Sequence, residues 1–423
     1  MEIIKSIGFV GLSHLGLNHL IAAAEKGFKV VGYQDDTLFI NNIKKNKLNI
    51  EEPGFKKLFK KNKKKILFTS DIKDLKKCDL VFISLDVPTD SKNKSSLKKI
   101  NYFVKSVTKT LKKNSALIIL SQVPPGYTKK INWKKENLYY QVETLIFGQA
   151  IKRSLQPERI IVGLNDKKFP INKKYSFYLS KFKCPIFYMD YLSAELCKTS
   201  INLFLTSSIS TTNILAEICE KTGASWSSIY PAIQADRRIG KYSYLKPGLG
   251  ISGGNLERDI NTLINIANKE KVNQNILKYF IKNSAERKKW IYSTLKKHYL
   301  SKKVSSGKIG ILGLSYKENT NSTKNSSALY LINKLKKYFI SVYDPKVSKI
   351  YLGKNIFREK SVNQVLKKSE ILIICTPWSE FRKIKINQLI RSIKKKIIID
   401  PFQILDRDKL IQNGFLYKSL GEL

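Results

Sequence analysis

The first thirty-six residues leave few folds open, because an apolar strand, a glycine-containing turn, a helix and a second apolar strand follow one another directly. We expect the first strand at residues 3–10, the helix at 17–28 and the second strand at 29–33. In a turn of this kind the first glycine permits the tight bend, the second lets a diphosphate approach the backbone, and the third lets the helix pack on the strand. The pattern predicts a βαβ unit that binds a dinucleotide.

The turn matches the dinucleotide-binding pattern only in part. Gly11 and Gly16 fill the outer glycine positions, whereas Ser13 stands at the middle one. Gln34 takes the place of the acidic residue expected to bind ribose hydroxyls, and Asp35 follows it. Two interpretations stay open: a working cofactor site, or the same fold with a weakened or lost nucleotide site. No arginine follows nearby to take a 2′-phosphate, which favours NAD over NADP.

Further apolar runs, each ended by proline or glycine, continue the alternation of strands and helices. They read CDLVFISLDVPTD, SALIILSQVPPGYT and ERIIVG, as expected for parallel strands buried on both faces. The pattern restarts with a strand at 308–314, a second glycine-containing turn, a helix at 326–338 and the strands FISVYDP, ILIICTP and KIIIDP. The predicted class is α/β, with two Rossmann-like parallel-sheet domains joined by a central helical domain.

One long helix is expected at residues 193–221, because no glycine or proline interrupts the stretch and apolar residues recur at helical spacing. Gly223 lies just past its end. Lys198 and Asn202 are four residues apart and share one face, so both could reach a ligand; the alternative is a solvated lysine and a surface asparagine. The helix has more apolar positions than one face needs, which predicts a homodimer.

A second helical stretch is expected at 255–298, and the segment SKKVSSGK at 301–308 reads as a linker. The predicted domain boundaries are therefore 1–190, 191–300 and 301–423.

The net charge of +45 would attract nucleic acid or an anionic membrane. The lysines are spread over every segment among isoleucine and asparagine, which favours the bias of an AT-rich genome over a specific nucleic-acid function. No run of eighteen apolar residues occurs, and the first residues read as a strand, so we expect a cytoplasmic protein without a membrane partner. The five scattered cysteines lack metal-ligand spacing, so no metal site is expected.

Short motifs recur in a fixed order along nearly the whole chain. They lie at residues 11–17, 52–54, 87–89, 121–124, 157–160, 194–202, 236–240, 312–317, 343–345 and 376–378. Together they resemble the motifs of the nucleotide-sugar 6-dehydrogenases, of the UDP-glucose and GDP-mannose dehydrogenase type. The resemblance implies oxidation of a sugar CH2OH group with NAD, a first domain that binds NAD, a central domain that dimerises and a last domain that binds the nucleotide sugar.

The resemblance also implies site residues. Those for NAD are Gly11, Ser13, Leu15, Gly16, Gln34, Asp35, Val87, Thr89 and Gln122. Those for a nucleoside-diphosphate sugar are Glu143, Lys198, Asn202, Arg238, Gly250, Gly253, Lys317 and Lys324. Those implied in catalysis are Lys198, Asn202, Asp259, Glu143 and Asn255.

The departures from the family pattern gather where the chemistry takes place. The family's cysteine attacks the aldehyde and forms a thiohemiacetal, but Asn255 stands at that position and an amide cannot act as this nucleophile. Gln122, Phe147 and Lys324 replace a threonine, a glutamate and an arginine of the family. Three hypotheses result. The first is an NAD-dependent nucleotide-sugar dehydrogenase that is altered or impaired, either without turnover or confined to the alcohol–aldehyde step. The second is a non-catalytic nucleotide-sugar binder or partner subunit, and the third is a polyanion-binding protein.

Overall fold

The computed structural model describes residues 4–48, 50, 52–88, 96–166, 170–300, 307–348, 350 and 353–423. Contacts within the chain divide it into two compact units, Met1–Ile201 and Asn202–Leu423. Residues 202–300 thus belong to the same unit as the C-terminal residues, while the three predicted domain boundaries stay a prediction.

The first unit contains an eight-stranded sheet in the order β3-β2-β1-β4-β5-β6-β7-β8. Its strands are β1 Ile7–Val10, β2 Val30–Tyr33, β3 Ile66–Thr69, β4 Leu80–Ile83, β5 Ala116–Ile119, β6 Leu138–Gln141, β7 Ile160–Leu164 and β8 Ile186–Asp190. Its helices are α1 His14–Glu25, α2 Thr37–Lys44, α3 Phe55–Asn62, α4 Lys98–Thr110, α5 Ala150–Leu155 and α6 Lys173–Ser180. Short 3-10 turns lie at η1 Lys63–Lys65, η2 Ile72–Lys77, η3 Thr128–Lys130 and η4 Lys135–Asn137.

Strands β1, β4, β5 and β7 of this sheet are fully buried, as the apolar runs predict, whereas the edge strands β3 and β8 are partly exposed. On β1, Ile7 and Phe9 belong to one buried cluster and Val10 to another, because alternate side chains point to opposite faces. The sheet is not parallel throughout: β6 and β7 pair antiparallel, while every other neighbouring pair is parallel.

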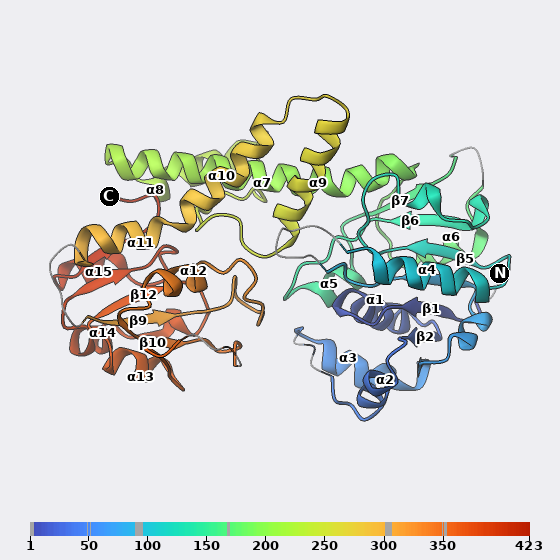
Figure 1. Cartoon of the computed structure of the whole chain (residues 1–423), viewed down its shortest axis with the longest axis horizontal. Coiled ribbons are helices and arrows are strands. Elements are labelled where there is room, and N and C mark those ends of the chain that lie inside the picture. Colours follow the sequence, from blue (N-terminus) through green and yellow to red (C-terminus); the bar gives the residue numbers. More distant parts are fainter. Residues whose placement is uncertain are drawn as a thin grey trace. The chain divides into compact units, whose positions relative to one another are not determined.

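Helix α7 (Tyr191–Thr222) is the predicted long helix and runs without a break, in green in Figure 1. It begins two residues before the expected start, because the Asp190 carboxylate accepts the backbone N–H of Ser193 at 2.9 Å. Beyond its end Gly223 adopts a φ of 85°, which confirms the predicted stop. The N-terminal part of α7 packs on the first unit, where the buried Glu195 accepts the N–H groups of Gly126 and Thr128.

In the second unit α8 (Trp226–Ala235), α9 (Asn255–Lys269), α10 (Asn275–Lys288), α11 (Trp290–Leu295) and the π-helical turn η5 (Lys296–Leu300) follow α7. The stretch expected as one helical region is broken between α9 and α10, where Lys271 adopts a φ of 58°.

The second sheet has six parallel strands in the order β11-β10-β9-β12-β13-β14, drawn in orange and red in Figure 1. The strands are β9 Lys308–Leu312, β10 Phe339–Tyr343, β11 Ile356–Arg358, β12 Ile371–Ile374, β13 Ile397–Ile399 and β14 Leu416–Lys418. The helices are α12 Ser327–Lys334, α13 Val362–Lys367, α14 Ile386–Ser392 and α15 Arg407–Gln412, with the 3-10 turn η6 Phe381–Lys383. Residues 301–306 of the predicted linker lie outside the described residues.

The two units repeat one turn. The sequences IGFVGLS (7–13) and IGILGLS (309–315) each run from the first strand of a unit into the turn that follows it. Gly11 and Gly313 in these turns adopt φ angles of 90° and 94°. In the second turn the buried Asp344 carboxylate accepts the N–H groups of Leu314 and Ser315 at 2.7 and 3.0 Å. The predicted fold class, two Rossmann-like sheets with helices between them in the sequence, is confirmed.

Candidate functional site

The glycine-containing turn at α1 can be formed only by glycine at its two outer positions. A Cβ at Gly11 would lie 2.8 Å from the Cβ of Leu85, and one at Gly16 would lie 2.1 Å from the Gly11 carbonyl oxygen. Gly11 therefore permits a close approach of β1 and β4, and Gly16 lets α1 pack on the turn. Leu15 is buried in the core, so only its backbone N–H faces the turn.

The N-terminus of α1 has an anionic neighbour that the sequence did not reveal. The N–H of Leu15 donates to Asp86 Oδ2 at 3.2 Å, and the N–H of Asp86 donates to Ser13 Oγ at 2.8 Å. The carboxyl group is crowded by protein although its side chain stays accessible to solvent, and this crowding raises the pKa of Asp86.

At the end of β2, Gln34 and Asp35 are already engaged. Gln34 Oε1 accepts the N–H of Leu12 at 3.0 Å, and Gln34 Nε2 donates to Asp35 Oδ1 at 3.1 Å. The other Asp35 oxygen pairs with Lys99 of α4, a cation that sequence reasoning missed. Lys99 lies over the rings of Tyr102 and Phe103, 5.2 and 4.9 Å from their centroids.

Two further predicted NAD residues, Val87 and Gln122, lie beyond the carboxyl ends of β4 and β5. Val87 is buried in the core, Gln122 is half-buried, and Thr89 lies outside the described residues. The carboxyl ends of parallel strands are where open α/β sheets bind ligands. Apart from Gln34 and Asp86, which accept the N–H groups of Leu12 and Leu15, this edge of the sheet fits a dinucleotide.

Glu143 and Lys198 meet in the first unit. Lys198 Nζ lies 3.5 Å from Glu143 Oε2, and both side chains are nearly buried. The other Glu143 oxygen accepts the N–H of Leu145. The partly desolvated lysine is therefore held by a carboxylate that a backbone donor keeps in place.

Phe147 packs against His14 in the first unit. Its ring centroid lies 4.3 Å from that of His14, whose Nε2 lies 2.8 Å from Glu52 Oε1. Burial raises the pKa of Glu52, but hydrogen bonds from His14 and from the backbone of Gly148 outweigh it and hold that pKa below its ordinary value.

Asn202 and Asp259 meet in the second unit. Asn202 Nδ2 donates to Asp259 Oδ2 at 2.5 Å, and Arg258 Nε donates to Asp259 Oδ1 at 3.1 Å. All three side chains are buried. The carboxylate therefore has a compensating cation and a neutral donor in a desolvated place.

The loop before α9 depends on its glycines. Gly250 and Gly253 adopt φ angles of 81° and 78°, and a Cβ at Gly250 would lie 2.4 Å from the Ser284 carbonyl oxygen. Asn255 is the first residue of α9 and is exposed.

The predicted substrate lysines lie close to the second turn. The Lys324 side chain packs closely on Gly254, where an added Cβ atom would lie 3.1 and 3.2 Å from its Cδ and Cε atoms. Lys317 Nζ lies 5.8 Å from the Tyr316 ring centroid. Burial raises the pKa of Tyr316 to about 12. Arg238 instead pairs at the surface with Asp236, at 2.6 Å.

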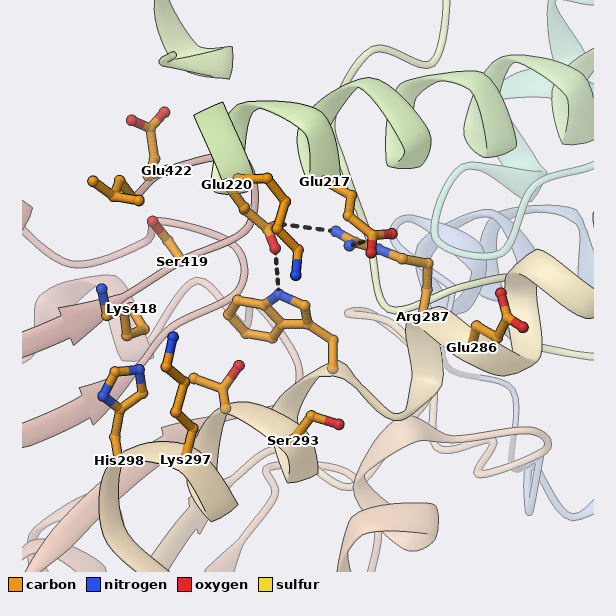
Figure 2. Close-up of a pocket in the computed structure, with 14 residues that line it drawn as sticks. Glu217, Glu220, Glu286, Arg287, Ser293, Lys297, His298, Lys418, Ser419 and Glu422 are labelled. Atoms are coloured by element: carbon orange, nitrogen blue, oxygen red, sulfur yellow. Dashed lines mark hydrogen bonds and ion pairs between the residues drawn. The ribbon is translucent and has the colours of Figure 1, made fainter. Parts of the chain in front are cut away.

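The second unit also contains a cavity of about 470 Å³ that none of the motif residues lines. Figure 2 shows Arg287 pointing toward Glu220. Glu220 accepts Arg287 Nη2 at 3.1 Å, Trp290 Nε1 at 2.7 Å and the N–H of Gly421 at 2.9 Å. This cluster fastens α10, α11 and the C-terminal residues to α7.

No helix in the described ranges has the length and apolar character needed to cross a membrane. Within the same ranges, no three His, Cys, Asp or Glu side chains gather closely enough to hold a metal ion.

The two sheets with their repeated glycine turn define a nucleotide-binding α/β protein with two Rossmann-like halves. The chain belongs to the UDP-glucose/GDP-mannose dehydrogenase family, whose NAD-binding, central and UDP-binding domain models match residues 5–178, 192–284 and 310–407. NAD is accordingly its cofactor.

Curated relatives cover almost the whole chain. A UDP-glucose 6-dehydrogenase of Rickettsia bellii is 28% identical over 432 residues, covering 98% of this chain and 99% of its own. The UDP-glucose 6-dehydrogenase YwqF of Bacillus subtilis is 28% identical over 434 residues, covering 98% and 97%.

Solved structures show the same fold. A UDP-D-ManNAc dehydrogenase from Pyrococcus horikoshii matches with a TM-score of 0.84 at 24% identity, over 98% of this chain and 99% of its own. A UDP-glucose dehydrogenase from Pyrobaculum islandicum matches with a TM-score of 0.81 at 22% identity, over 90% and 92%.

Proposed function

We propose that this chain is an NAD-dependent nucleotide-sugar 6-dehydrogenase whose reaction stops at the aldehyde. The observation that carries the proposal is the buried Asn202–Asp259 pair, which lies in the same unit as the exposed Asn255. By the resemblance, Asn255 stands where the family has its nucleophilic cysteine. In the proposed step the sugar CH2OH carbon loses a hydride and its hydroxyl loses a proton, giving an aldehyde, NADH and a proton. The bound cofactor supplies the hydride acceptor.

We assign the orientation of the reacting hydroxyl and the stabilisation of its developing charge to residues on one face of α7. Lys198 and Asn202 are one helical turn apart, so side chains at both positions can address the same sugar hydroxyl. Lys198, paired with Glu143, would stabilise the developing alkoxide, and Asn202 would orient the oxygen. Asp259 would accept a proton by way of water.

The second oxidation needs the aldehyde to be bound covalently to the protein, since a free aldehyde becomes hydrated and dissociates. Asn255 can hydrogen-bond an aldehyde or its hydrate but cannot form that bond. Oxidation to a carboxylate is therefore not expected from this chain.

The test is the yield of NADH per nucleotide sugar consumed, with mass spectrometry of the product. One NADH per sugar and an aldehyde product support the proposal. Two NADH and a carboxylate from the unmodified protein would contradict it. Asn255→Cys alone is expected not to restore the second step, because Gln122 and Phe147 also depart from the family pattern.

A non-catalytic nucleotide-sugar binder or partner subunit is the second candidate. Gln34 and Asp86 favour this candidate, because they already accept hydrogen bonds from backbone N–H groups of the glycine-containing turn at α1. Nucleotide-sugar binding by calorimetry without any NADH formation would select this candidate.

For the substrate we propose a nucleoside-diphosphate sugar, because relatives are named UDP-glucose 6-dehydrogenases and the model matching residues 310–407 is a UDP-binding domain. Lys317 and Lys324 fall within that range, and Arg238, Gly250 and Gly253 fall within the central one. We assign the diphosphate to the two lysines, whose cations can form charge-assisted hydrogen bonds with it.

We also propose that the chain forms a homodimer through α7. Along this helix Phe204 is 77% exposed, and Leu215 and Ile218 are exposed as well. A second copy would cover these apolar side chains. Sedimentation that shows a monomer at micromolar concentration would contradict the dimer.

A further inference from the structure

We propose that Asp86 is an internal competitor for the diphosphate of the cofactor and thereby sets the affinity of this chain for NAD. The inference rests on the proposed NAD-dependent function, but it concerns binding and not turnover.

Asp86 lies just beyond β4, at the edge of the sheet where α1 begins. The first amides of a helix have no partner within the helix, and together with the helix dipole they attract anions. In Rossmann folds these amides receive the dinucleotide diphosphate. Here the N–H of Leu15, the second residue of α1, donates to the Asp86 carboxylate at 3.2 Å. The first turn of α1 contains no acidic residue of its own.

Ser13 holds the competing carboxylate in place. Its hydroxyl accepts the backbone N–H of Asp86 at 2.8 Å and donates to the carbonyl oxygen of Ser84 at 3.3 Å. Ser13 stands where the dinucleotide pattern has its middle glycine. The lost glycine and the added carboxylate are therefore one arrangement, since the serine anchors the segment that carries Asp86.

A diphosphate that approaches these amides meets a carboxylate at the same donor. Binding then requires the Leu15–Asp86 bond to break and two anions to lie near one another, which weakens affinity. His14 on α1 favours the negative charge of Asp86, whereas Glu143, which follows β6, disfavours it. Asp86 therefore lies in a mixed electrostatic field. A ligand without phosphate does not compete with Asp86.

The test compares calorimetric affinities for NAD⁺, ADP and adenosine in the whole protein. Asp86→Asn should bind NAD⁺ and ADP about tenfold more tightly, which is about 1.4 kcal/mol, and adenosine with unchanged affinity. Asp74→Asn is the matched control, because it makes the same charge change on η2, where Asp74 lies 3.9 Å from Lys77. This control should leave all three affinities unchanged.

Unchanged or weaker binding of NAD⁺ and ADP by Asp86→Asn would overturn the proposal, as would an equal gain for adenosine. Ser13→Gly supplies an independent variant should Asp86→Asn not fold, because Ser13 makes no side-chain capping bond to α1. It should give a smaller gain for NAD⁺ and ADP, and no gain would count against the proposal. A chain that binds these ligands without forming NADH would refute the proposed function and leave this result standing.

Discussion

The side-chain amide of Asn202 donates a hydrogen bond to the carboxylate of Asp259, 57 positions further along the chain. Arg258 donates to the other oxygen of the same carboxylate. Helix α7 and helix α9 are thereby joined inside the second unit by a buried group that carries charge.

Asn202→Ala removes a side-chain donor to the buried Asp259 carboxylate. The free energy of unfolding should fall by about 1–3 kcal/mol, the usual cost of an unsatisfied buried acceptor. Urea denaturation followed by fluorescence measures this change. The rate of the first NADH formation should fall as well, and a variant with an unaltered urea midpoint would show that the pair contributes nothing to stability.

Lys317→Ala should weaken nucleotide-sugar binding by about 1–3 kcal/mol if the ammonium group contacts the diphosphate. Isothermal titration with a panel of nucleotide sugars gives the affinities. Lys334→Ala is the control, since this exposed lysine of α12 lies over the ring of Tyr330. Equal affinities for the native chain and for Lys317→Ala would place the substrate elsewhere.

Asp35→Asn should shift cofactor preference toward NADP. The substitution frees Lys99 from its ion pair and leaves a cation beside the place expected for the adenosine ribose. We expect the ratio of NADP to NAD affinity to rise about tenfold, a change of about 1.4 kcal/mol. The double variant with Lys99→Ala should lose this gain, and an unchanged ratio in Asp35→Asn would exclude Lys99 from cofactor selection.

Glu220→Gln should destabilise the second unit. It leaves Arg287, whose side chain is 3% exposed, with Glu217 as its remaining acidic partner at 3.6 Å. Removal of one partner from a buried pair costs up to about 3–5 kcal/mol, and the remaining Glu217 should keep the loss at or below the lower end of that range. Glu217→Gln is the matched control, because Glu217 is 52% exposed and its loss should cost about 1 kcal/mol or less. Equal thermal midpoints for the two variants would contradict this role.

The stability of the chain should depend on Asp344 in acid. Burial raises the pKa of Asp344, but the N–H donors of Ser315 and Leu314 outweigh it and hold that pKa below its ordinary value of 3.8. A carboxyl group with a depressed folded-state pKa contributes stability above its unfolded pKa and loses it as pH falls through the folded value. The thermal midpoint should therefore fall below about pH 4, and Asp344→Asn should flatten this part of the profile. An identical profile in the variant would exclude Asp344 as the source.

Local patterns in the sequence were enough to predict much of the fold. The strand before Gly11, the restart at β9 and the length of α7 follow from apolar periodicity and from the positions of glycine and proline. The antiparallel pairing of β6 with β7 was not predicted, because neither strand stands out by composition from its parallel neighbours.

The candidate site could be predicted less fully, because its contacts join distant positions. Asp86 and Leu15 are 71 residues apart, and Lys99 and Asp35 are 64 residues apart. No periodic pattern connects such pairs, so a scan for residues near the glycine turn finds Gln34 and misses both Asp86 and Lys99. The roles assigned to Lys198, Asn255 and the substrate lysines stay predictions.

The repeated turn has a consequence for how many cofactor molecules one chain can take up. After Gly11 a helix begins at once, at His14, whereas after Gly313 the next helix begins only at Ser327. The N-cap residue Ser326 of α12 reaches this second turn, where its hydroxyl donates to the Leu314 carbonyl oxygen at 2.7 Å. The Asp344 carboxylate, however, already accepts the N–H groups of Leu314 and Ser315. We therefore expect one dinucleotide-binding site per chain, at the first sheet. A titration with NAD⁺ should saturate at a single equivalent per chain.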